Sequence, residues 1–181
     1  MIEKALIEEC RNGNLNNFRD IVELCSPMVF SIAFRIVGDE EEARDIVQET
    51  MVKLWQKLPG IKDTEKFRSW MCRITVNNCN DHLRRRKRNN EVRYDDKAWA
   101  VLSDHLSGGG ITELENIENA RILNFLTNKL SNRQKVVFIL SEIEEMPATE
   151  VARVTGISRT AVKANLYYAR KKMEELLRKY L

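Results

Sequence analysis

Glycine, proline and histidine are scarce in this sequence. Its 181 residues include only seven glycines, three prolines and two histidines. So few turn-forming residues leave little material for a β-rich fold with many tight turns. The sequence also shows no plausible pair of catalytic carboxylates, no Ser/His/Asp set, no phosphate-binding loop and no metal cluster. We therefore expect neither an enzyme nor a bound cofactor or metal.

Long apolar runs and paired cysteines are also missing. No segment is apolar enough to span a membrane, and no signal peptide is visible, so we expect a cytoplasmic protein without membrane insertion. The cysteines are Cys10, Cys25, Cys72 and Cys79, and none forms a CxxC pair, which is typical of a reducing compartment. Cys79 and His82 would share a helix face, but packing is favoured over metal binding because two ligands do not make a site.

Charge is unevenly distributed along the chain. The formal net charge of +3 does not by itself indicate a nucleic-acid partner. However, residues 39–49 are strongly acidic, residues 84–88 form an unbroken basic run, and the chain is basic again from Arg159 onward. Segregated charge of this kind predicts one surface for an anion and another for a basic partner.

The first half of the chain has helical periodicity. Apolar residues recur at steps of three and four between residues 15 and 36, which predicts a helix that Pro27 breaks or kinks and Gly38 ends. Asp39 and Glu42 form a plausible capping pair for the next helix.

That second helix is expected to end at Pro59-Gly60. A short polar loop over residues 60–65 follows. A third helix then begins with Phe67 and continues into the basic run.

The second half begins with a segment of weak periodicity. Residues 91–115 include Gly108–Gly110 and are interpreted as a flexible linker. Helical patterns return afterwards, with a helix over residues 117–130, a capping box at Ser131 and Gln134, and two further helices after Pro147. The sequence thus predicts an all-α fold. It has two small helical domains, at 1–90 and 116–181, joined by a flexible linker at 91–115, and the C-terminal domain contains a helix-turn-helix.

The helix-turn-helix is predicted from three spaced residues. Ala152 is small where two helices cross, Gly156 suits the turn, and Val162 faces back to the first helix. Ser158 caps the second helix. A recognition helix of this kind enters the major groove, and basic residues beyond it contact phosphates. The candidate DNA-binding residues are Ser158, Arg159, Thr160, Lys163, Ala164, Tyr167, Arg170 and Lys171. The alternative is an ordinary αα corner with a solvated basic face.

Four stretches of the chain are informative together. They are DEEEARDIVQETMVKLW at 39–55, FRSWMCRITVN at 67–77, DHLRRR at 81–86 and GISRTAVKANLYYAR at 156–170. With these stretches the chain resembles the extracytoplasmic-function (ECF) group of bacterial RNA polymerase sigma factors. Each stretch is moderately specific, but their order, with a linker before the helix-turn-helix, is highly specific.

The resemblance implies that the acidic helix docks on core RNA polymerase. The residues onto which it carries this role are Glu42, Asp45, Gln48 and Glu49. The last three recur at i, i+3 and i+4 and so form one polar stripe opposite the apolar face. Without the resemblance, a solvated helix face would be the preferred interpretation.

The resemblance also implies that residues 58–88 recognise the promoter −10 region, where a base is extruded from the melted strand. The candidate residues are Ile61, Lys62, Asn77, Arg84, Arg85 and Arg88. Ile61 stands where family members often place an aromatic residue. Trp70 is in phase with Phe67 and Ile74, so core packing is favoured over a role as a melting wedge.

In the family, the linker threads a polymerase channel, and the acidic residues Asp95, Asp96 and Asp104 would suit a groove built for RNA phosphate. The expected function is therefore that of an alternative sigma factor that binds core RNA polymerase and promoter DNA, with an anti-sigma factor as a further partner. The alternative is a dimeric helix-turn-helix regulator with residues 1–89 as a ligand or dimerisation domain. That alternative predicts a palindromic DNA site and leaves the acidic stripe unexplained.

Overall fold

The computed structural model describes residues 4–11, 15–61, 63–88 and 123–180, and these residues contain helices and turns but no strand. The helices form two compact units whose boundary falls near Arg84. The predicted all-α class is therefore confirmed. The predicted linker, residues 91–115, lies outside the described residues.

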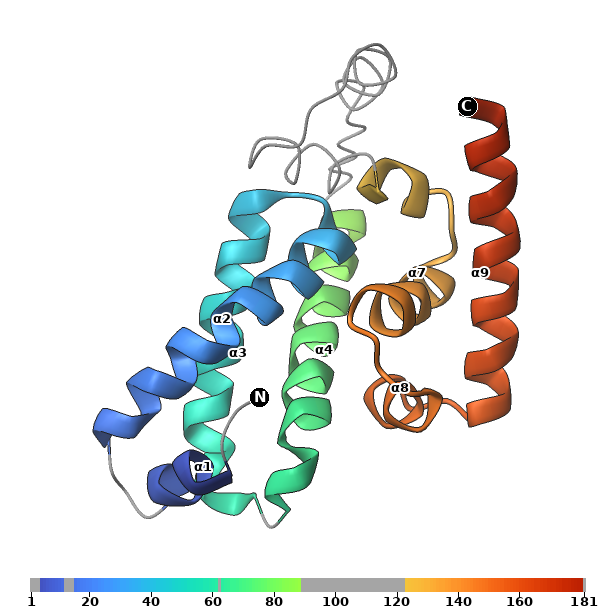
Figure 1. Ribbon diagram of the computed structural model, residues 1–181. Helices are drawn as coiled ribbons and strands as arrows, with labels where there is room; N and C mark the ends of the chain where they lie inside the picture. The colour runs from blue at the N-terminus through green and yellow to red at the C-terminus, as the bar shows by residue number, and fades with distance from the viewer. Residues whose placement is uncertain (1–3, 12–14, 62, 89–122, 181) are drawn as a thin grey trace, which may run out of the picture. The chain divides into compact units, whose positions relative to one another are not determined.

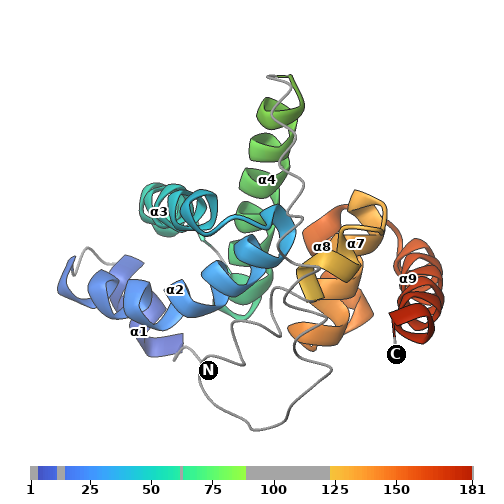
Figure 2. The same cartoon turned by 90° about the horizontal axis from the view of Figure 1, so that it is seen from above.

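The N-terminal unit is built from four α-helices. They are α1 (Lys4–Arg11), α2 (Leu15–Val37), α3 (Glu40–Lys57) and α4 (Phe67–Arg88), with single 3-10 turns at Leu58–Gly60 and Thr64–Lys66. In Figures 1 and 2, α1 lies beside the first part of α2, and α2 packs along α3. The buried faces of α2, α3 and α4 follow the spacing of three and four residues that the sequence predicts.

Helix α2 continues through Pro27, so of the two predicted outcomes, a break or a kink, the break does not occur. A proline inside a helix removes one backbone hydrogen bond and crowds the preceding turn. Here Cys25 and Val29, on either side of Pro27, are completely buried in the core of the N-terminal unit. Packing of both halves of the helix on one core outweighs the local cost.

The turn between α2 and α3 follows the sequence prediction. Gly38 has a φ of 78° and donates its N–H to Phe34 O at 2.8 Å, which ends α2 in the left-handed conformation that glycine favours. Asp39 then caps α3, because its Oδ1 accepts from Glu42 N at 3.0 Å. The first turn of α3 also holds three glutamates, at 40–42, whose negative charges interact favourably with the positive end of the helix dipole.

The C-terminal unit begins, within the described residues, with helical residues 123–127. It continues with α7 (Asn132–Phe138), a π-helical turn η3 (Ile139–Ile143), α8 (Ala148–Thr155) and α9 (Arg159–Tyr180), and α7 packs against α9 (Figure 1). Both bonds of the predicted capping box are present: Gln134 N donates to Ser131 Oγ, and Ser131 N donates to Gln134 Oε1.

The helix-turn-helix consists of α8, a short turn and α9. Gly156 ends α8 with a φ of 72° and donates its N–H to Ala152 O at 2.9 Å. Ser158 Oγ accepts from Ala161 N at 3.1 Å and so caps α9. Val151, Val154 and Val162 are buried. The turn at Gly156, the cap at Ser158 and the buried Val162 were all predicted from the sequence.

Candidate nucleic-acid and protein interfaces

The first candidate surface is the outer face of α9, which we call the recognition face. All eight of its predicted DNA-binding residues are exposed: Ser158, Arg159, Thr160, Lys163, Ala164, Tyr167, Arg170 and Lys171. The opposite side of the helix, with Val162, Ala169 and Met173, is buried. This division gives α9 one face for the core and one that a DNA groove can reach.

Two aromatic residues stand out on α9. Tyr167 and Tyr168 are 63% and 58% exposed, and their rings meet edge to face with centroids 5.5 Å apart. Tyr167 was predicted as a DNA-binding residue, whereas Tyr168 was not. Exposed aromatic rings with a polar hydroxyl are suited to contacts at interfaces, so Tyr168 adds to the surface beside the recognition face.

Arg170 makes a contact that the sequence did not reveal. Its Nε and Nη2 both donate to Oε1 of Glu142, at 3.1 and 2.7 Å. Glu142 belongs to the π-helical turn η3, 28 residues earlier in the chain. A contact between residues so far apart in the sequence depends on how α7, η3 and α9 pack. No local sequence pattern predicts it.

The second candidate surface lies along α4. Asn77 is exposed, as are Arg84, Arg85 and Arg88 near the end of the helix. Arg84 also pairs with Asp81 at 3.4 Å. The α4 residues thus combine an exposed amide with exposed guanidinium groups, the chemistry needed to contact bases and phosphates of an unpaired strand.

Arg73 is an α4 residue that the sequence reasoning missed. It is exposed and lies one helical turn before Asn77, and Arg84 lies two turns after Asn77, so the three share a side of α4. The sequence feature that could have identified Arg73 is its spacing of four residues from Asn77. Arg73, Asn77 and Arg84 define what we call the α4 stripe.

Ile61 is not where the sequence interpretation needs it. Its side chain is 8% exposed and belongs to the core cluster of the N-terminal unit, together with Ile7 and Phe67. A base cannot stack on a side chain that is already covered by its own core. Ile61 is therefore a packing residue in this structure. Lys62, its predicted neighbour in the site, lies outside the described residues.

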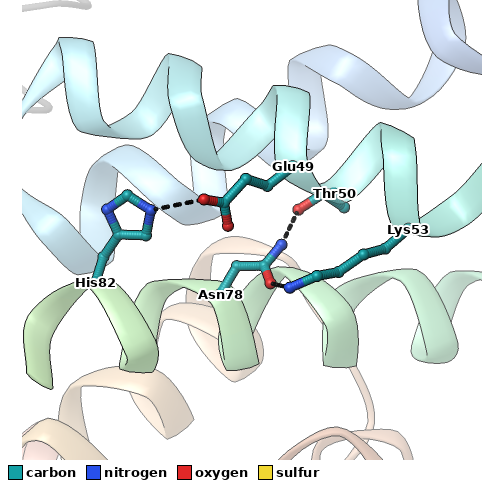
Figure 3. Close-up of polar contacts among 5 residues, drawn as sticks. All are labelled: Glu49, Thr50, Lys53, Asn78 and His82. Carbon is teal, nitrogen blue, oxygen red and sulfur yellow. Dashed lines mark hydrogen bonds and ion pairs between the residues drawn. The ribbon is translucent and has the colours of Figure 1, made fainter. Parts of the chain in front are cut away.

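A polar seam joins α3 and α4 behind the α4 stripe, and Figure 3 shows its five residues. Asn78 is only 1% exposed, and its Nδ2 donates to Thr50 Oγ1 at 3.0 Å. Lys53 Nζ donates to the side-chain amide oxygen of Asn78, Oδ1. At the other end of the seam, His82 Nε2 lies 3.3 Å from Glu49 Oε1.

The third candidate surface is the predicted polymerase-docking stripe on α3. Asp45 and Gln48 are exposed, whereas Glu42 and Glu49 are partly buried. The Glu49 side chain is 37% exposed and is held by His82, which comes from α4. The structure therefore presents Asp45 and Gln48 most openly, with Glu49 fixed at the edge of the stripe.

Two apolar residues extend this stripe and were missed as site residues. Val52 is 51% exposed and Trp55 is 43% exposed. Together with Asp45 and Gln48 they recur at steps of three and four, so they share one side of α3. The Trp55 ring rests edge to face on Phe18 of α2, with centroids 4.7 Å apart.

Other residues singled out in the sequence serve the core. Trp70 packs against the N-terminal core with its ring 6.0 Å from that of Phe67, which confirms the packing interpretation. Cys79 is buried, and burial also raises the pKa of Cys25 to about 12, so that thiol stays protonated. The described residues hold no cluster of three potential metal ligands. Over the same residues, every helix is too short or too polar to cross a membrane.

Comparison with known proteins gives two family matches. Residues 21–89 match sigma-70 region 2, and residues 121–173 match sigma-70 region 4. The chain is 23% identical to the ECF RNA polymerase sigma factor SigW of Bacillus subtilis, over 98% of both chains. It is 28% identical to the RNA polymerase sigma factor SigV of the same organism, over 97% of this chain and 93% of that one.

Solved structures show the same fold. The chain superimposes on CnrH, solved in complex with the cytosolic domain of CnrY, with a TM-score of 0.72, 24% identity and coverage of 97% of both chains. It also matches the sigma factor RpoE, solved with the anti-sigma factor NepR from Bartonella quintana, with a TM-score of 0.68 and 20% identity, over 91% of this chain and 98% of that one.

Two sigma-70 regions in the expected order, and relatives that match over nearly their whole length, define the class. The chain belongs to the sigma-70 family of RNA polymerase sigma factors and, within it, to the ECF group. It is an alternative sigma factor that associates with core RNA polymerase and directs promoter recognition and transcription initiation. The match of the N-terminal unit to region 2 decides against the dimeric helix-turn-helix regulator.

Proposed function

We propose that this sigma factor divides its work among three surfaces: the recognition face of α9, the α4 stripe with its basic end, and the polar stripe of α3. We assign region 2 to residues 1–90, a linker to 91–115 and region 4 to 116–181. The observation that carries the proposal is that all eight candidate residues of α9 are exposed while the other side of the same helix is buried.

In this proposal the recognition face binds the upstream, −35 promoter element as duplex DNA. Arg159, Thr160 and Lys163 lie near the start of α9, the end of a recognition helix that approaches base edges. Arg170 and Lys171 lie two to three turns later and contact phosphates, which position the helix without carrying sequence information. Ser158 caps the start of α9. It therefore supports DNA binding by holding the first turn of the recognition helix in place.

The α4 stripe contacts the melted strand of the −10 element. Asn77 offers an amide to a base edge. The phosphates of the melted strand are contacted by Arg73, Arg84, Arg85 and Arg88. Support comes from the exposure of these five residues. Contacts available only after strand separation offset part of the cost of extruding a base.

The α3 stripe docks on core RNA polymerase. Support comes from the exposed Asp45 and Gln48 and from the exposed apolar pair Val52 and Trp55. An interface needs an apolar centre that excludes water as well as polar groups that set orientation. A basic partner surface with an apolar strip would satisfy both parts of the stripe.

We further infer that an anti-sigma factor covers one or more of these surfaces when the protein is silent. Similarity to RpoE, which was solved with its anti-sigma factor, supports this partner. The protein has no catalytic role of its own in this proposal. It acts in the cytoplasm, where bacterial RNA polymerase transcribes the genome.

Run-off transcription tests the proposal as a whole. The full chain is mixed with core polymerase and fragmented genomic DNA, and discrete transcripts are expected only when both proteins are present. Transcripts that are identical with core polymerase alone would contradict it. The same assay supplies the promoter that the later experiments need.

A further inference from the structure

The ion pair between Arg170 and Glu142 has a geometry that leaves part of the arginine available. Both donors that reach Glu142, Nε and Nη2, lie on one edge of the guanidinium, and both use the same carboxylate oxygen. A guanidinium has five N–H groups in a rigid plane, so the Nη1 side retains donors for a second anion. The pair therefore fixes the plane of the arginine without saturating it.

The arginine of this pair is more exposed than the glutamate, as a contact of Arg170 with DNA requires. The Arg170 side chain is 62% exposed, whereas that of Glu142 is 30% exposed. An anion that approaches from solvent meets the guanidinium before the carboxylate. The guanidinium is therefore the more accessible member of the pair.

The backbone at Glu142 is unusual in a way that bears on this pair. Residues Ile139–Ile143 form a π-helical turn, with Glu144 N donating to Ile139 O at 3.0 Å. Glu145, two residues after this turn, has a φ of 51°, which a residue with a side chain rarely adopts. Isolated π-turns and strained residues of this kind concentrate at functional positions.

We propose that Glu142 is a positioning residue for Arg170, and that it holds the guanidinium so that its remaining donors meet a phosphate of the upstream promoter DNA. The inference rests on the proposed function, because it needs Arg170 to contact phosphate. It adds a residue on η3, outside the helix-turn-helix, to the DNA-binding apparatus. An arginine fixed in advance loses less side-chain freedom when it binds.

The test uses holoenzyme made from the full chain and core polymerase, titrated on labelled duplex from the strongest run-off promoter at several KCl concentrations. The variants are Arg170→Ala, Glu142→Ala, Glu142→Gln and the double alanine variant. Glu174→Ala is the matched control, because Glu174 forms a comparable 2.6 Å pair with Arg178 on the same helix. Thermal unfolding by circular dichroism of each free variant reports on the fold.

Arg170→Ala and Glu142→Ala are each expected to weaken binding by about tenfold, the size of one charge-assisted hydrogen bond. Each is also expected to reduce the slope of log Kobs against log[KCl] by about one unit, the value for one phosphate contact. The double variant is expected to be no weaker than Arg170→Ala. Glu142→Gln, which keeps the acceptor oxygen, is expected to retain most of the affinity, and Glu174→Ala all of it.

Several outcomes would overturn the inference. Unchanged or tighter binding by Glu142→Ala, with weaker binding by Arg170→Ala, would make Glu142 a bystander or a competitor of the phosphate. Weaker binding with an unchanged salt slope and a lower melting temperature would make Glu142 a purely structural residue. Unchanged binding by Arg170→Ala would instead refute the phosphate assignment of the proposed function, and the inference with it.

Discussion

The amide of Asn78 on α4 donates to Thr50 Oγ1 on α3 at 3.0 Å, and both side chains are buried. Lys53 adds a second bond to the same amide. These contacts join the helix proposed to dock on polymerase to the helix proposed to hold the melted strand. Asn77, the preceding residue, lies on the exposed side of α4, so two successive asparagines have different roles.

This relationship predicts different effects for the two asparagines on stability. Asn78→Ala leaves the partners Thr50 and Lys53 unsatisfied and is expected to lower the free energy of unfolding by about 1–3 kcal/mol. Asn77→Ala removes an exposed side chain and is expected to change it by no more than about 0.5 kcal/mol. Urea unfolding followed by circular dichroism measures both. A loss of less than about 0.5 kcal/mol for Asn78→Ala would show that the seam does not stabilise the unit.

Asn77 is instead expected to matter for promoter opening. Asn77→Ala should leave closed-complex formation nearly intact and abolish open complexes on duplex promoters, since the cost of extruding a base is no longer offset. Permanganate footprinting of unpaired thymines reports the opening directly. A premelted promoter should restore part of the activity. Normal thymine reactivity of the variant on duplex DNA would remove Asn77 from the proposed site.

Polymerase docking should depend on the charge of the α3 stripe. Asp45→Lys combined with Glu49→Lys is expected to weaken binding to core polymerase while helicity is retained, because the stripe would then repel a basic partner. Pull-down of core polymerase by the tagged chain provides the measurement. Glu23→Lys, at an exposed position on α2, serves as a control for charge reversal away from the stripe. Undiminished recovery of polymerase by the double variant would refute this docking surface.

Two glycines provide a matched test of the helix-turn-helix turn. An added Cβ would meet nothing within 4 Å at either Gly60 or Gly156, but only Gly156 has a positive φ, of 72°. Gly156→Ala is therefore expected to cost about 1–2 kcal/mol through backbone strain alone. Gly60→Ala is expected to range from no effect to a gain of about 1 kcal/mol. Comparison of the two urea midpoints separates strain from crowding.

Features set by neighbouring residues in the sequence could be predicted. The cap at Asp39, the capping box at Ser131 and the turn at Gly156 each depend on residues within one helical turn of one another. The exposed face of α9 follows from the same short-range periodicity once Val162 is placed in the core. For this reason the sequence alone predicts the helix-turn-helix, including which side of α9 is exposed.

Features set by packing between distant segments could not be predicted. Ile61 lies between two helices and looked like a loop residue, but its burial depends on the core that it shares with Ile7 and Phe67. Helix α2 runs through Pro27 because packing of both halves on the core outweighs the local tendency of proline to break a helix. The contacts of Asn78 with Thr50 and of Arg170 with Glu142 each span 28 residues, and no spacing rule connects them.

The two-residue connection at Gly38 and Asp39 has a consequence for the order of folding. The entropy lost on closing a loop grows with its length, so this short connection makes the pairing of α2 with α3 inexpensive and fast. Both helices also leave the ribosome before α4 does. The α2–α3 hairpin is therefore expected to assemble first, and α4 completes the seam through Asn78 once it emerges. A nascent chain would thus display the stripe of Asp45 and Gln48 before it acquires the helix that holds DNA.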